Sequence, residues 1–374
     1  MFTRRNSTLV SHYDGMFSRY SASASRTNSD VQSDLIAFLS IIQKCDVDYL
    51  PITWQPALSP LGVGGSGTIS QSTVIPHKPL AFKRFHHSES SDGDFLPAMS
   101  EVLILSQPPI QINPNIVDLE GICWEINPRT EKAFPVLVFE KASWDLQQFM
   151  NVSEGMDMEI EDRLKICADI GSAIAALHAY GLSIYDCYRS SWKSDKDIGV
   201  VHGDVKPQNV LVFKSAITRM TTVKVADFGY STLTAGGSGT VLLPKSRPWN
   251  APEHHFGEFK AHEAKKTDVY SFGMLCLWVL FGNFLSDVPQ TTADGAAGVI
   301  LFDAPFLSSP TLLERLKNED RLEYVCNHLV DSIPGLNVEY RARLKKVFSL
   351  TLLLDPGKRT CDLARVIGLL SQKK

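Results

Sequence analysis

The stretch that decides the fold reads V-V-H-G-D-V-K-P-Q-N-V-L-V and runs from Val200 to Val212. Between its two apolar runs lie the polar side chains of His202, Asp204, Lys206 and Asn209, among others. A loop with only a structural role does not require so many polar side chains. An aspartate at such a place can accept a hydroxyl proton, a lysine can neutralise a transferring phosphate, and an asparagine can hold a metal ion.

Two further motifs frame this loop. Val223 to Gly229 reads V-K-V-A-D-F-G, a strand that ends in a turn with Asp227 at its tip, where a carboxylate suits magnesium. Upstream, L-G-V-G-G-S-G-T-I gives the spacing G-x-G-x-x-G at Gly62, Gly64 and Gly67. Alone it is a weak signal, because a plain glycine hairpin gives the same pattern. Without the spacing of a P-loop or a following helix, a hairpin that covers phosphates fits better.

A lysine and a glutamate complete the pattern. Lys83 ends the apolar, strand-like run P-L-A-F-K, where its ammonium must meet a partner because a buried unpaired lysine is costly. Glu101 lies in a helical window near residues 95–106 and can supply that carboxylate. Taken singly, each is more often a surface charge.

In this order and density the motifs resemble those of a eukaryotic-type protein kinase, over roughly residues 50–370. The resemblance implies an α+β, two-lobed protein kinase fold: a small antiparallel-sheet N-lobe with one main helix, then a larger, mostly helical C-lobe. We expect the following units: a disordered Ser/Arg-rich tail over 1–30, a helical extension over 31–48, the N-lobe over 49–140 and the C-lobe over 141–374.

The resemblance implies ATP as phosphoryl donor and assigns its contacts. The positions that match are Gly62, Gly64, Gly67, Ile69, Ala81, Lys83, Glu140, Ala142, Asp145 and Leu211. The three glycines would cover the phosphates, and Lys83, paired with Glu101, would hold the α and β phosphates. Ile69, Ala81 and Leu211 would sandwich adenine. The backbone of residues 140–142 would receive the adenine edge, and Asp145 would contact the ribose.

The same resemblance assigns the chemistry. Asp204 would be the catalytic base, Lys206 would meet the γ-phosphate, and Asn209 with Asp227 would bind two magnesium ions. The sequence D-V-K-P-Q-N resembles the serine/threonine branch, so the expected acceptor is a Ser or Thr hydroxyl of a protein. Four positions resemble the family's regulatory spine: Leu105, Leu119, His202 and Phe228.

Later motifs extend the resemblance. Residues 251–253 read A-P-E, and L-D-P-G-K-R supplies Arg359, which in the family pairs with the A-P-E glutamate, here Glu253. Met274 to Phe281 is the most membrane-like stretch, but it is too short to span a bilayer and is interpreted as a buried core helix.

The sequence departs from the family at two places. Gly203 replaces the arginine of H-R-D that normally meets a phosphorylated activation loop, so switching through that pocket is in doubt, although loop residues such as Ser231, Thr232 and Ser246 could still be phosphorylated. Residues 182–199 form an insertion between a helix expected to end at 178–181 and the catalytic loop. A tolerated surface insertion is favoured over a docking element.

Composition bounds the partners. The chain has 41 acidic and 37 basic residues, a net charge of -4 and 44% hydrophobic content, which disfavours a nucleic-acid partner and any disordered class. Its 7 cysteines form no Cys-x-x-Cys pair, which favours a reducing compartment.

The resemblance implies an intracellular, cytoplasmic enzyme with no integral membrane segment, a nuclear location being the alternative. Residues 1–29, with four Arg, seven Ser and one acid, also fit a mitochondrial transit peptide, though a disordered tail is favoured. Oligomeric state is not indicated.

Two other functions stay open at this level. H-G-D followed by Asn209 is also typical of aminoglycoside and choline kinase relatives, which phosphorylate small alcohols; the glycine run, Lys206, the complete D-F-G and A-P-E count against them. A pseudokinase that binds ATP and serves as a scaffold is the non-enzymatic alternative. All five family positions for ATP and catalysis are present and count against it: Lys83, Glu101, Asp204, Asn209 and Asp227.

Overall fold

A computed structural model describes most of the chain. The described residues are 28–50, 60–63, 67–72, 79–85, 95–126, 133–186, 199–215, 220–233, 240–256, 258–282, 310–333 and 335–371. The predicted tail therefore lies almost entirely outside them, as does Gly64.

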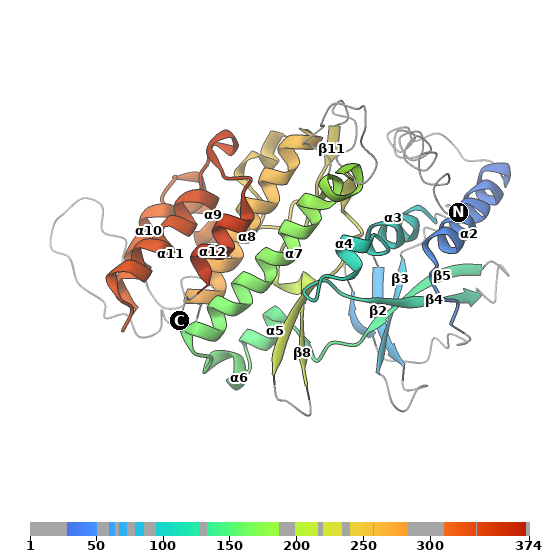
Figure 1. The fold of residues 1–374 in the computed structure, drawn as a ribbon, viewed down its shortest axis with the longest axis horizontal. Helices are drawn as coiled ribbons and strands as arrows, with labels where there is room; N and C mark the ends of the chain where they lie inside the picture. The colour runs from blue at the N-terminus through green and yellow to red at the C-terminus, as the bar shows by residue number, and fades with distance from the viewer. Residues whose placement is uncertain are drawn as a thin grey trace.

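A five-stranded antiparallel sheet forms the N-terminal part of the fold, in the order β1-β2-β3-β5-β4. Its strands are β1 (Pro60–Val63), β2 (Gly67–Ser72), β3 (Leu80–Phe85), β4 (Leu119–Ile126) and β5 (Ala133–Glu140). Figure 1 shows this sheet at one end of the molecule, beside helices α2 (Asn28–Cys45) and α3 (Leu96–Leu105), and most of the later helices toward the other end. The predicted α+β architecture, an antiparallel sheet with one main helix followed by a mostly helical region, is confirmed.

The two faces of the sheet bury different side chains, because successive residues of a strand point to opposite faces. One face carries a small separate cluster, formed by Leu80, Phe82, Cys123, Val136 and Val138. The other face joins the main core through Phe85, Leu137 and Phe139. Lys83 stands opposite Leu137 in the β3–β5 register and so belongs to this second face. The strand alternation therefore turns its ammonium toward the core.

Helix α3 (Leu96–Leu105) carries Glu101 to that ammonium. Proline at its start and the run of buried side chains from Ala98 onward fit a helix that packs on a sheet. The short α4 (Pro108–Gln111) follows it. The predicted helical window near 95–106 is thus confirmed.

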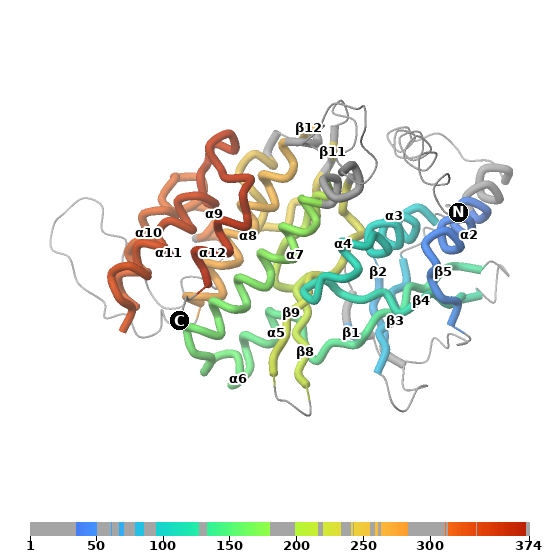
Figure 2. The backbone as a smooth tube through the Cα atoms, in the orientation of Figure 1, coloured from blue at the N-terminus to red at the C-terminus, as the bar shows by residue number. Residues whose placement is uncertain are grey.

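The helical extension predicted over residues 31–48 corresponds to α2 (Asn28–Cys45), which begins and ends three residues earlier than predicted. It packs against α3, as Figure 2 also shows. Phe38, fully buried, contacts the rings of Phe95 and Trp124 at centroid distances of 5.6 and 5.8 Å. The chain after α2 then follows β4, where Leu50 N donates to Ile122 O at 2.8 Å.

Gly121 makes this attachment possible. Its φ is +149°, and a Cβ there would lie 2.6 Å from the carbonyl oxygen of Asp48. A side chain at this position would therefore push the extension off the sheet.

A matched pair of substitutions in α2 tests its docking. Ile42 is fully buried, whereas Ile36 is 60% exposed on the same helix. We expect Ile42→Val to lower the free energy of unfolding by about 0.5 to 1.5 kcal/mol, because it deletes a buried methyl group. Ile36→Val should change it by less than about 0.5 kcal/mol. Urea unfolding measures both, and equal losses would show that the inward face of α2 is not packed as described.

The rest of the fold is mainly helical. Its helices are α5 (Leu146–Met150), α6 (Ser153–Met156), α7 (Ile160–Asp186), α8 (Ala261–Phe281), α9 (Pro310–Asn318), α10 (Leu322–Ser332), α11 (Val338–Thr351) and α12 (Leu363–Leu370). Helices α8 and α12 pack against α7 (Figure 1). The stretch Met274–Phe281 ends α8 and is buried except for the partly exposed Trp278, which confirms a core helix. None of the helices that the structure describes is long and apolar enough to cross a membrane.

The end of α7 differs from the prediction. The helix was expected to end at residues 178–181, yet it continues to Asp186, so the first five residues of the predicted insertion are helical. Gly181 does not end the helix because an interior glycine costs only about 1 kcal/mol relative to alanine. Residues 187–198 lie outside the described part of the chain.

Two short ladders hold the motif-bearing loops side by side. Strand β7 (Val200–Val201) pairs with β10 (Thr232–Leu233), and β8 (Val210–Lys214) pairs with β9 (Thr221–Val225) and with β6 (Trp144–Asp145). The loop with Asp204 runs from β7 to β8, and the loop with Asp227 runs from β9 to β10. Both ends of the two loops are therefore fixed to each other. The division into lobes at residue 140 stays a prediction.

Candidate active site

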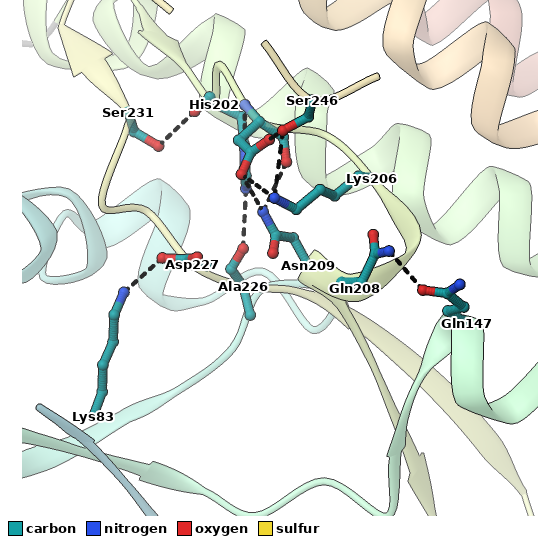
Figure 3. Close-up of polar contacts among 11 residues, drawn as sticks. Lys83, Gln147, His202, Lys206, Gln208, Asn209, Ala226, Asp227, Ser231 and Ser246 are labelled. Atoms are coloured by element: carbon teal, nitrogen blue, oxygen red, sulfur yellow. Dashed lines mark hydrogen bonds and ion pairs between the residues drawn. The ribbon is translucent and has the colours of Figure 1, made fainter. Parts of the chain in front are cut away.

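Lys83 links two carboxylates from distant parts of the chain. Its Nζ lies 2.6 Å from Glu101 Oε2 and 2.6 Å from Asp227 Oδ1 (Figure 3 shows the second contact). Burial alone would lower the pKa of Lys83, but the charges of Glu101 and Asp227 outweigh it and raise that pKa above the ordinary value. Burial raises the pKa of Glu101, with Lys83 opposing it. The predicted Lys83–Glu101 pair is thus present, and it reaches the D-F-G turn.

Asp227 is held in a strained turn. Its φ is +62°, the left-handed region that residues other than glycine rarely adopt. The next residue, Phe228, is fully buried, stacks 5.2 Å from the His202 ring and donates its N–H to Glu101 Oε1 at 3.4 Å. Leu105 and Leu119 belong to the same core. The buried phenylalanine thereby turns the Asp227 carboxylate toward Lys83.

Asp204 is the centre of a second hydrogen-bond cluster, whose other members Lys206, Asn209 and Ser246 are labelled in Figure 3. Its side chain is buried, and its Oδ2 accepts from Lys206 Nζ at 2.7 Å and from Asn209 Nδ2 at 3.0 Å. Its Oδ1 accepts from Ser246 Oγ at 2.5 Å. A carboxylate that accepts a serine hydroxyl beside an ammonium group is arranged to take up a hydroxyl proton.

The orientation of Asn209 leaves its amide oxygen for another ligand. Both bonds of its Nδ2 go to Asp204, to the carbonyl oxygen at 2.8 Å and to Oδ2. The amide oxygen therefore points away from Asp204. Together with the Asp227 carboxylate it offers the oxygen ligands that magnesium prefers, so these two residues fit the predicted metal.

Asp268 anchors the loop that carries Asp204, and the sequence reasoning gave it no part in the site. From α8 it accepts the backbone N–H of His202 at 2.8 Å and of Gly203 at 2.9 Å, and it contacts His178 Nε2 at 2.9 Å. It is 1% exposed. The available signal was a lone acid at the start of an apolar run, D-V-Y-S-F-G, where a buried carboxylate needs partners.

The backbone conformation and the close neighbours of Gly203 account for a glycine at the position where the sequence departs from the family pattern. Its φ is +79°, and a Cβ there would lie 2.9 Å from Leu243 Cδ2 and 3.1 Å from Tyr230 O. Leu243 packs with Val201 in a small cluster that includes β11 (Thr240–Leu242) and β12 (Glu258–Lys260). Apolar packing therefore holds the segment after β11 against the loop where the family has an arginine.

Three of the residues predicted to contact ATP share one face of the five-stranded sheet. Ile69 pairs with Lys83, and Ala81 pairs with Phe139, which places all four on the face of Lys83. Leu211 lies on β8, opposite Lys224. The structure thus brings Ile69, Ala81 and Lys83 together on a face.

The glycines and the residues after β5 also have structural roles. Gly62 lies in β1, and a Cβ on Gly67 would meet Arg84 O at 2.1 Å, so Gly67 serves close strand pairing. The Glu140 side chain pairs with Lys224, and Lys141 N donates to Pro79 O at 3.1 Å. Ala142 follows in an irregular segment.

Asp145 caps α5, because its Oδ1 accepts Gln148 N at 2.7 Å, and burial raises its pKa. The predicted ribose contact of this carboxylate therefore competes with a helix cap.

The comparison with protein families covers most of the chain. Residues 57–350 match the family described as protein kinase domain. The chain belongs to the protein kinase family. Curated relatives of this kinase come from Arabidopsis thaliana: a leaf rust 10 disease-resistance locus receptor-like protein kinase-like 2.1 is 26% identical over 65% of this chain and 33% of its own length. Wall-associated receptor kinase-like 14 is 29% identical over 63% of this chain and 29% of its own length. Calmodulin-binding receptor-like cytoplasmic kinase 1 is 26% identical over 60% of this chain and 42% of its own length. The kinase thus spans less than half the length of these relatives.

Two serines proposed as modification sites in this kinase lie in the site itself. Ser246 donates to the Asp204 carboxylate, and Ser231, which is 7% exposed, donates to His202 O at 3.1 Å. A phosphate on Ser246 would bring its charge against Asp204 and oppose the observed arrangement. Only the tertiary structure showed the Ser246 contact, because the two residues are 42 positions apart.

Proposed function

We propose that this protein kinase transfers the γ-phosphoryl group of ATP to serine or threonine hydroxyls of proteins. The observation that carries the proposal is the Asp204 cluster, in which one carboxylate accepts a lysine ammonium and a serine hydroxyl at the same time. The D-V-K-P-Q-N sequence supports the serine/threonine branch. We also propose an intracellular location, where ATP is plentiful.

On the acceptor side, Asp204 would orient the hydroxyl and take up its proton. Ser246 Oγ marks a position that a hydroxyl can occupy, 2.5 Å from Asp204 Oδ1. An acceptor hydroxyl would replace Ser246 there or share the carboxylate with it. Lys206, bonded to the other oxygen, would stabilise negative charge as the phosphoryl group moves.

On the donor side, Lys83 would hold the α and β phosphates, with Glu101 fixing its position. The glycines at 62, 64 and 67 would cover the phosphates. Ile69, Ala81 and Leu211 would enclose adenine, whose edge would meet the backbone of Glu140 and Ala142, because the Lys141 N–H is already bonded. Asn209 and Asp227 would hold magnesium, which neutralises phosphate charge when bound.

The test is phosphotransfer by the purified chain, with γ-labelled ATP and magnesium, to a mixed protein acceptor and, separately, to small alcohols. Phosphoserine or phosphothreonine is the expected product. Label on the small alcohols alone would replace the proposal with small-molecule phosphorylation. Absence of transfer with intact ATP binding would favour a scaffold.

Lys83→Met tests the role of Lys83 in the same phosphotransfer assay. It removes the ammonium that faces Asp227 and Glu101, and we expect turnover to fall about 100- to 1000-fold, as for other preorganised donors. Arg84→Gln is the control, since Arg84 follows on the same strand but pairs with Glu125 at 3.1 Å. Equal activity of the two variants would contradict the role of Lys83.

A further inference from the structure

Lys317 is a buried cation outside the described site. It lies on α9, its side chain is 0% exposed, and its Nζ donates to three acceptors. These are Pro248 O at 3.1 Å, Asn250 O at 3.0 Å and Glu314 Oε1 at 2.6 Å. An ammonium has three donors, so this one is fully satisfied.

The two carbonyls belong to a turn that touches the catalytic carboxylate. Asn250 N donates to Ser246 O at 3.0 Å, which closes the turn over residues 246–250. Ser246 at its start donates to Asp204. Lys317 therefore holds the far side of the turn whose near side meets Asp204.

A purely structural role does not require a charge at this place. A buried ammonium carries a desolvation penalty, and burial does lower the pKa of Lys317, with Glu314 opposing it. An apolar side chain could fill the same volume without that penalty. An apolar side chain could not, however, donate hydrogen bonds to two carbonyl oxygens, and so it could not fix the backbone of the turn.

We propose that Lys317 is a positioning residue for the protein acceptor. By fixing the Pro248 and Asn250 carbonyls, it keeps the turn 246–250 at the distance from Asp204 that an incoming hydroxyl requires. The inference rests on the proposed function, because it assigns the turn to the acceptor. Lys317 is remote from Lys83 and Asp227 in this network and acts on the acceptor, not on ATP.

The experiment compares wild type, Lys317→Met and Lys345→Met in the full chain. Lys345 is a partly exposed lysine that pairs with Asp331 on the surface, and it serves as the matched control. For Lys317→Met we expect the KM for the protein acceptor to rise about tenfold, with the KM for ATP changed by less than about twofold. An equal rise of both KM values, or a fall of kcat alone, would overturn the proposal.

Hydrogen exchange gives a readout that does not depend on phosphotransfer. The amides of Arg247 and Asn250 are bonded within or next to the turn, and in Lys317→Met they should exchange about tenfold faster, with no such change in Lys345→Met. If wild type transfers no phosphate to proteins but the turn still loosens in Lys317→Met, the proposed function and the acceptor role both fail, and only the hold of Lys317 on the turn is supported. Unchanged exchange would overturn the positioning itself.

Glu314→Gln covers the case in which Lys317→Met does not fold. This variant keeps the lysine and removes only its charged partner, which is 17% exposed. It should raise the KM for the protein acceptor but not the KM for ATP, and it should speed the exchange of the Arg247 and Asn250 amides. Both effects should be smaller than those of Lys317→Met. A Glu314→Gln protein with wild-type values on both readouts would count against the proposal.

Discussion

Replacing Asp204 with asparagine is expected to lower phosphotransfer turnover by about two to four orders of magnitude, because an amide cannot accept the hydroxyl proton. The fold should tolerate the change. Lys206 and Asn209 both donate to Oδ2, so the amide oxygen will take that place, and the new NH2 group will face Ser246, whose hydroxyl can accept as well as donate.

ATP affinity separates this role from a general loss of structure. The hydrogen bonds of the Asp204 carboxylate go to Lys206, Asn209 and Ser246, so calorimetric binding of magnesium-ATP should stay within about threefold of wild type. Asp169→Asn is the control, since Asp169 is a surface carboxylate on α7 that pairs with Lys165. Turnover of Asp204→Asn close to that of this control would refute the role of catalytic base.

Replacing Arg359 with methionine is expected to lower the free energy of unfolding by about 3 to 5 kcal/mol. Its guanidinium binds both oxygens of Glu253, at 2.5 and 2.8 Å, and also donates to three backbone carbonyls, those of Leu353, Leu354 and Lys266. The side chain is 0% exposed. Its loss would leave a mostly buried carboxylate without its charge partner and would remove a side-chain donor from three carbonyls.

Calorimetry should show this as a lower Tm, by about 4 to 6 °C, because the unfolding entropy grows with chain length. Arg343→Met is the matched control, because Arg343 also binds two carbonyls, Gly368 O and Ser371 O, but at the surface. Adding Glu253→Gln to Arg359→Met should cost less than the sum of the two single changes, because the uncompensated charge is then gone. Additive losses would mean that the pair is not coupled.

Much of the candidate site follows from local spacing. In D-V-K-P-Q-N the aspartate, lysine and asparagine lie within six residues on one tight loop, and in the structure Lys206 and Asn209 do meet Asp204. The Lys83–Glu101 pair could also be predicted, because the two residues are only 18 positions apart, on the successive elements β3 and α3. Ser246 and Lys317 were different. Their roles could not be predicted, because Asp204 lies 42 positions from Ser246, and the two carbonyls that Lys317 binds lie 67 and 69 positions from it.

The sequence by itself determined which loops carry the polar groups and which segments are buried. Strand alternation and motif spacing act over a few residues, and they turn Lys83 to the core and gather Asp204, Lys206 and Asn209 on one loop. Only the tertiary structure decided what meets those groups. Packing of α8 and α9 against the A-P-E region brings Asp268 to the loop and Lys317 to the turn at Ser246. The physical reason is that buried charges need partners, and a chain can supply them from any distance along the sequence once its helices have packed.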